Sequence, residues 1–174
     1  DLNPSEGKNP SDYYRLIMQS ELRNMQVVSD TIDCVKRGRT PVIMTKYKEH
    51  AQKLYDMLQG SADHVFLLQG GKSLKERAAI REEMAAVRAD ESIILVAIGQ
   101  YVCEGFNYPR LDTMLLAMPI SLEGNVEQHA GRLNRDYEGK KDAIIFDYID
   151  QHVPALKRMY YRRLRAYKKI GYEV

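Results

Sequence analysis

The sequence predicts an α/β domain of three layers, in which a mostly parallel sheet is flanked by helices. Short, almost wholly apolar runs recur along the chain, and segments with helical patterns separate them. Strands that helices cover on both faces are expected to be apolar throughout, whereas a strand with one wet face alternates. The length of 174 residues suits a single domain with a substantial core.

Five segments have the composition expected of buried strands. Each contains almost no polar residue, and a helical pattern or a turn signal follows most of them. The five predicted strands comprise residues 41–45, 65–68, 93–97, 114–118 and 143–146.

The helical segments between the strands have recognisable ends. Residues 12–37 are predicted to form one or two helices that stop at Gly38, because glycine adopts the left-handed conformation common at helix ends. A second helical pattern covers residues 46–58. Ser73 opens the next helix, which reaches about residue 87, since Ser73 and Glu76 match a capping box.

A basic helix is predicted at the C-terminus, over residues 153–172, with Pro154 in its first turn. Residues 155–174 contain seven Lys or Arg and one acidic residue. One interpretation is a docking helix whose charged face is simply solvated, and the pattern favours it. The other is a nucleic-acid contact by the basic face with its interleaved tyrosines. The two faces are formed by Leu156, Tyr160, Leu164 and Tyr167 and by Arg158, Arg162, Arg165 and Lys169.

Composition narrows the class of protein. Hydrophobic residues make up 44% and charged residues 29% of the chain, and no apolar run reaches the ~20 residues that span a bilayer. We therefore expect a cytoplasmic protein with no membrane partner. Cys34 and Cys103 lie far apart and the four histidines are scattered, so no metal site is predicted. The expected organisation is one domain, with a helical segment over residues 1–38 and an α/β core over 39–150.

Residues that directly follow the predicted strands are candidate ligand contacts, because parallel sheets bind ligands at the carboxyl ends of their strands. Thr45 and Lys46 follow the first strand, Gly71 the second and Gly99 the third. Glycines there let a backbone approach a phosphate closely. The run from Gly70 to Ser73 is not a P-loop, because Phe66 occupies the place of its first glycine.

A polar run near the end of the chain points to phosphate chemistry. Gln128, Arg132 and Arg135 are spaced i, i+4 and i+7, so one helix face would present all three. Asn125 is the expected N-cap of that helix. Gly131 costs a helix ~1 kcal/mol relative to alanine, which suggests close approach of a backbone or ligand. The alternative is a solvated basic face near a helix C-terminus.

Three segments, in chain order, resemble motifs IV, V and VI of superfamily 2 helicases. They are residues 42–45, 97–107 and 128–135, and the similarity extends from about Leu22 to the C-terminus. The closest resemblance is to bacterial DEAD/DEAH-type helicases of the type III restriction-subunit kind. It implies that the chain is the second RecA-like motor domain, while the N-terminal RecA-like domain with the Walker motifs lies outside it.

The resemblance also implies roles for individual residues. Arg132 and Arg135 would be arginine fingers, acting on ATP that is bound with Mg²⁺ mainly by the N-terminal domain. Gln128, Gly105 and Asn107 would contact the nucleotide. The nucleic-acid side, with DNA favoured over RNA, would be formed by Thr45, Lys46, Gly71 and Gly99.

Two positions depart from the family pattern. Ile98 and Asn107 stand where motif V commonly has threonine and aspartate, and isoleucine cannot donate a hydrogen bond to a phosphate. A non-catalytic nucleic-acid-binding or regulatory module therefore remains the alternative to a helicase motor. A small-molecule enzyme acting alone has little support, because no acid–base pair or nucleophile stands out. Without Walker motifs, the isolated chain is expected not to hydrolyse ATP.

Overall fold

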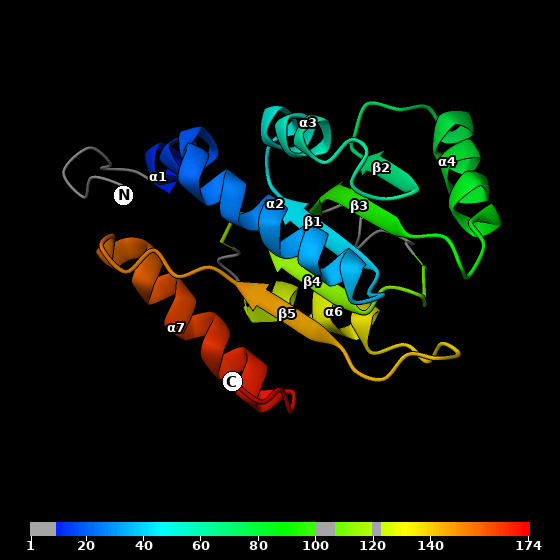
Figure 1. Cartoon of the computed structure of the whole chain (residues 1–174). Coiled ribbons are helices and arrows are strands. Elements are labelled where there is room, and N and C mark those ends of the chain that lie inside the picture. Colours follow the sequence, from blue (N-terminus) through cyan, green and yellow to red (C-terminus); the bar gives the residue numbers. More distant parts are fainter. Residues whose placement is uncertain (1–9, 100–106, 120–122) are drawn as a thin grey trace.

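A computed structural model describes residues 10–99, 107–119 and 123–174, and it confirms the predicted α/β architecture (Figure 1). Five strands form one sheet in the order β2-β3-β1-β4-β5, and every neighbouring pair is parallel. All five predicted strands are present, with ends that differ by no more than two residues. The strands are β1 Pro41–Thr45, β2 His64–Leu68, β3 Ile93–Ile98, β4 Thr113–Leu116 and β5 Ile144–Asp147.

Helices connect the strands and cover both faces of the sheet (Figure 1). The predicted N-terminal helical segment is two helices, separated at Ser20, whose hydroxyl caps the second one. Gly38 ends that segment with a φ of 75°, and Ser73 and Glu76 form the expected capping box. The helices are α1 Pro10–Gln19, α2 Glu21–Lys36, α3 Lys48–Met57, α4 Leu74–Ala86, α6 Glu123–Leu133 and α7 Pro154–Lys169.

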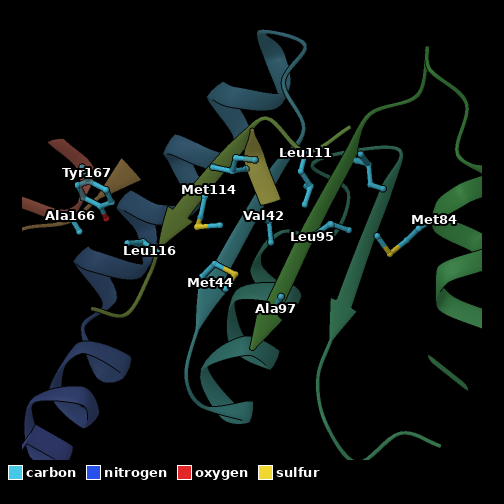
Figure 2. Close-up of a cluster of buried hydrophobic side chains, with 12 residues drawn as sticks. Val42, Met44, Met84, Leu95, Ala97, Leu111, Met114, Leu116, Ala166 and Tyr167 are labelled. Atoms are coloured by element: carbon cyan, nitrogen blue, oxygen red, sulfur yellow. The ribbon is translucent and has the colours of Figure 1, made fainter. Parts of the chain in front are cut away.

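The central strands divide their side chains between two cores, as the two-residue period of a strand requires. Val42 and Met44 of β1 point into one core, where Met84 of α4 and Tyr167 of α7 also pack (Figure 2). Ile43, between them in sequence, points into the opposite core under α2 and α3. The sheet is therefore buried on both faces, which explains the absence of alternation in the sequence.

The terminal helix docks through a buried ion pair as well as through apolar residues. Arg163 is only 2% exposed, and its Nε and Nη2 donate to the two carboxylate oxygens of Asp147 at distances of 2.6 and 2.8 Å. Tyr167 donates its hydroxyl proton to the same carboxylate at 2.9 Å. This contact fixes α7 against the carboxyl end of β5, so that Arg158, Arg162 and Arg165 remain exposed as predicted.

Candidate functional site

The loops after β1, β2 and β3 meet at one edge of the sheet. Strand β3 lies between β2 and β1, so the residues that follow these strands are neighbours. A Cβ atom added to Gly71 would lie 3.3 Å from Nζ of Lys48, which shows that the loops after β1 and β2 touch. Gly71 has a φ of +89°, a conformation that favours glycine. The structure thus brings together Lys46, Gly71 and Gly99.

Lys46 carries the exposed positive charge of this edge. Its Nζ lies 4.5 Å from the centroid of the Tyr14 ring and 6.0 Å from that of Tyr47. A cation over aromatic faces is attracted by their negative quadrupole. Lys48, the first residue of α3, lies beside Gly71, and Lys72 directly follows Gly71 in the chain.

Thr45, in contrast, points inward. Its side chain is 5% exposed, and its hydroxyl lies 2.7 Å from Nδ1 of His50. Nε2 of His50 lies 2.8 Å from Oδ1 of Asn24, while the amide nitrogen of Asn24 donates to the carbonyl of Met18. Oδ1 of Asn24 is then an acceptor, so Nε2 of His50 carries the proton and Nδ1 accepts from Thr45. The expected contact of Thr45 with nucleic acid would therefore have to come from its main chain.

His50 is a residue that sequence reasoning missed. Burial lowers its pKa to about 4, helped by the nearby positive charges of Arg23 and Lys53, so the ring is neutral near pH 7. It links the end of β1 to α2 and, through Asn24, to the last turn of α1. A lone histidine in an amphipathic helix gives no signal of such a network before the partners are placed.

The helix α6 differs from its prediction at both ends. It begins at Glu123, so Asn125 lies in its first turn and is not the N-cap. It ends at Leu133, so Arg135 lies beyond the helix and does not share a helical face with Gln128 and Arg132. Both predictions were wrong because they rested on local sequence alone. Asparagine is a favoured N-cap residue, and the spacing of i, i+4 and i+7 continues past Leu133, where the helix ends.

Arg135 instead reaches the segment that precedes β4. Its Nη1 donates a hydrogen bond to Oδ1 of Asn107. Lys140 reinforces this junction, because its Nζ donates to the carbonyls of Arg135 at 2.8 Å and Pro109 at 3.1 Å. Two residues that were predicted separately, one as an arginine finger and one as a nucleotide contact, are therefore in direct contact.

Asn107 does not lie at the carboxyl ends of the strands, where its place after β3 suggested it would be. Arg110, three residues later, bonds to the main-chain carbonyls of Arg88 and Glu91, which precede β3. It also bonds to Thr40, which precedes β1. The stretch leading into β4 therefore runs beside the amino ends of the sheet. Gly105 lies outside the described residues.

His129 packs α6 against the end of β3. Its side chain is buried, and its Cε1 and Nε2 would lie 3.8 Å from a Cβ added to Gly99. Burial, together with the positive charge of Arg132, lowers the pKa of His129 to about 4. Gly99 thus provides room for the helix that carries Gln128 and Arg132. No local pattern distinguishes His129 from the other three histidines.

Comparisons with known proteins find named helicases among the proteins similar to this chain. No family model matches the chain. The probable helicase D10 of Escherichia phage T5 is 27% identical over 139 residues, which are 80% of this chain and 30% of D10. The uncharacterized protein 108L of Invertebrate iridescent virus 3 is 34% identical over 86 residues, which are 48% of this chain and 76% of 108L.

Solved structures identify the fold. UvsW of phage T4 superposes on 94% of this chain with a TM-score of 0.74 and 19% identity, and the match covers 36% of UvsW. The chain has the RecA-like fold of this protein. The C-terminal part of the Fun30 ATPase domain also matches, with a TM-score of 0.63 and 15% identity over 87% of this chain and 49% of that one. These matches show that the chain shares its fold with domains of ATPases and helicases.

The chain corresponds to only part of the length of these relatives. It spans about a third of the length of D10, and the UvsW sequence match covers 28% of that protein. In the described part of the chain, no helix is long and apolar enough to cross a membrane. The same residues contain no group of three His, Cys, Asp or Glu side chains that could hold a metal ion.

Gly131 has no close neighbour outside its own helix among the described residues. A Cβ atom added to this exposed residue of α6 would meet nothing within 4 Å among the described residues. The close approach that the sequence suggested is therefore not made by the part of this chain that the structure describes. Because Gly131 lies on an open helix surface beside Arg132, it leaves room for a group that does not belong to the described part of this chain.

Proposed function

We propose that this chain is the second motor domain of an ATP-dependent nucleic-acid helicase or translocase. The observation that carries the proposal is the contact of Arg135 with Asn107, which joins the segments that resemble motifs VI and V. A guanidinium has five N–H donors, so a bond to Asn107 leaves others for a phosphate. Arginines that neutralise charge on a transferred phosphoryl group are a large part of catalysis in this reaction class.

The nucleotide would be ATP with Mg²⁺, bound mainly by an N-terminal RecA-like domain outside this chain. Arg132 and Arg135 would act as fingers on its γ-phosphate. Gln128 is exposed on the same helix as Arg132 and would contribute a hydrogen bond, and Gly105 and Asn107 would contact the nucleotide. Support comes from the relatives, which are named a probable helicase and an ATP-dependent DNA helicase.

The nucleic acid would lie along the edge formed by the loops after β1, β2 and β3. Lys46 supplies an exposed positive charge there, the exposed Gly71 keeps the main chain accessible, and Gly99 would contribute its main chain at the end of β3. Thr45 would contribute its main chain. Contacts to phosphates fix position without reading sequence, which suits a motor that moves along a strand. DNA is the favoured partner, because one relative is named a DNA helicase.

A non-catalytic binding or regulatory module is the second candidate. It is favoured by Ile98, whose side chain is buried in the core under α2 and α3 and so cannot contact a phosphate. Asn107 can hydrogen-bond a ribose but carries no charge.

ATP turnover separates the two candidates. The purified chain should show no nucleic-acid-stimulated ATP hydrolysis, because half of the proposed site belongs to another domain. The full-length protein that contains it should hydrolyse ATP when DNA is added. Turnover by the pure chain would contradict the proposal, and a full-length protein without turnover would favour the regulatory module.

A further inference from the structure

The outward side of α7 presents a stripe of positive charge. Five residues form what we call the α7 basic face: Lys157, Arg158, Arg162, Arg165 and Lys168. All five are exposed. Their spacing places them on one side of the helix, and Tyr161, 51% exposed, lies among them. The opposite side of the helix is buried and consists of Leu156, Arg163, Ala166 and Tyr167. Figure 1 shows α7 as the outermost element beside β5.

Within the part of the chain that the structure describes, the charges of this face have no acidic partner. Among the described residues, no acidic side chain forms an ion pair with any of the five, whereas Arg163 and Lys169 of the same helix pair with Asp147 and Glu127. Arg158 and Arg162 are four residues apart, and Arg162 and Arg165 are three apart. Such like-charged neighbours each destabilise a helix by about 0.2–0.5 kcal/mol. Contact with water leaves this repulsion in place, whereas a bound polyanion would neutralise the charges.

The shape of the face fits the phosphate backbone of a nucleic acid. From Lys157 to Lys168 a helix extends roughly 16 Å. Duplex DNA carries one charge per ~1.7 Å of its axis, so several phosphates lie within reach. An anionic membrane fits less well, because a helix that binds lipid needs an exposed apolar side, and that side of α7 is buried in the core.

We propose that the α7 basic face is a second nucleic-acid contact, separate from the sheet edge, that holds the phosphate backbone without reading sequence. The inference rests on the proposed function, because that function supplies the nucleic acid. It adds a surface that the motif resemblance does not include. In the full-length protein, this contact would keep the nucleic acid bound to α7 while the sheet edge releases it.

The test is the salt dependence of binding by the 174-residue chain to a short fluorescent duplex DNA. A triple variant, Arg158→Gln, Arg162→Gln and Arg165→Gln, should bind at least about tenfold more weakly. The slope of log K against log salt should fall by about 2 to 3, because each lost phosphate contact removes ~0.9. The matched control, Arg37→Gln, Lys75→Gln and Arg81→Gln, removes the same charge from exposed positions elsewhere and should keep the wild-type slope.

A third variant separates this inference from the proposed function. Lys46→Gln with Lys48→Gln weakens the sheet edge only. If this double variant loses DNA binding while the α7 triple variant keeps both affinity and slope, the inference is wrong and the sheet-edge interface stands. Equal losses in the α7 variant and its matched control would also overturn the inference. A wild-type chain that binds no DNA, or that binds anionic vesicles in its place, would overturn the inference, whereas ATP turnover by the full-length protein tests the proposed function separately.

Discussion

Arg163 is buried although the basic residues around it in the sequence are exposed. It lies in a run of basic residues that suggested a solvated surface, yet it is buried and forms a bidentate pair with Asp147. Charge-assisted pairs of this geometry are stronger than neutral hydrogen bonds. Burial and the Asp147 carboxylate both raise the pKa of Tyr167, which keeps its hydroxyl as a donor to the same carboxylate.

Replacing Arg163 should therefore destabilise the domain strongly. Arg163→Met leaves the Asp147 carboxylate buried without its cation, and we expect a loss of about 3–5 kcal/mol in the free energy of unfolding. Arg162→Met, at the exposed neighbouring position, should change it by no more than ~0.5 kcal/mol. Urea unfolding of the two variants measures the difference, and similar midpoints would show that the buried pair does not hold α7.

The buried histidines predict a loss of stability in mild acid. The pKa values of His50 and His129 are each lowered to about 4, below the unfolded value near 6.5. The folded state disfavours the charged ring, so its stability is complete above pH ~6.5 and is lost as the pH falls toward 4. Each histidine contributes up to about 3 kcal/mol over that window.

Unfolding in urea at pH 7 and at pH values down to ~5 checks this dependence. His50→Gln should flatten it by removing one titrating group, whereas His152→Gln, at an exposed position, should leave it unchanged. Equal pH dependence in wild type and His50→Gln would contradict the account of the Thr45, His50 and Asn24 network.

At the scale of elements, strands were easier to predict than helix ends. The bounds of β1 follow from the sequence alone, because an uninterrupted apolar run has one structural solution when helices cover both faces. The capping box of α4 was equally clear, since both of its hydrogen bonds are local. The ends of α6 were not, because the contact of Arg135 with Asn107 joins residues 28 positions apart and no local pattern encodes it.

Gly131 offers a test within α6. Beyond the backbone of its own helix, no described atom lies within 4 Å of its added Cβ, so Gly131→Ala should stabilise the isolated chain by about 0.5–1 kcal/mol through helix propensity. Gly38→Ala is the control, because Gly38 has equally open surroundings but a φ of 75° that alanine rarely adopts. Thermal unfolding should rise for the first variant and fall for the second. A destabilised Gly131→Ala chain would mean that this helix is packed more tightly than the structure shows.

At the scale of the whole molecule, the sequence predicted the layers but not the arrangement of the site. The apolar runs established a covered parallel sheet, and the residues after β1, β2 and β3 do meet at one edge. The position of Asn107 could not be predicted, because the strand order and the contacts of Arg110 decide at which end of the sheet it lies. The candidate nucleic-acid residues and the Arg135–Asn107 contact therefore lie in different parts of the domain.

This separation suits a domain that contacts two partners at once. The sheet edge with Lys46 would face a nucleic-acid strand, while Arg132 and Arg135 would face a nucleotide held by another domain. His129 joins the two regions, because it packs against Gly99 at the end of β3 and lies three residues before Arg132. A shift of α6 would therefore move residues both at the sheet edge and around Arg132.

The most direct test of this account is nucleic-acid-stimulated ATP turnover by the full-length protein that contains this chain. Arg132→Ala and Arg135→Ala should each lower kcat by about 10³-fold or more, because the lost charge acts on the transition state. ATP affinity should change less. Arg81→Ala, at an exposed position of α4, should turn over ATP as the wild type does. Wild-type turnover in both Arg132→Ala and Arg135→Ala would contradict the claim that this domain completes the ATP site.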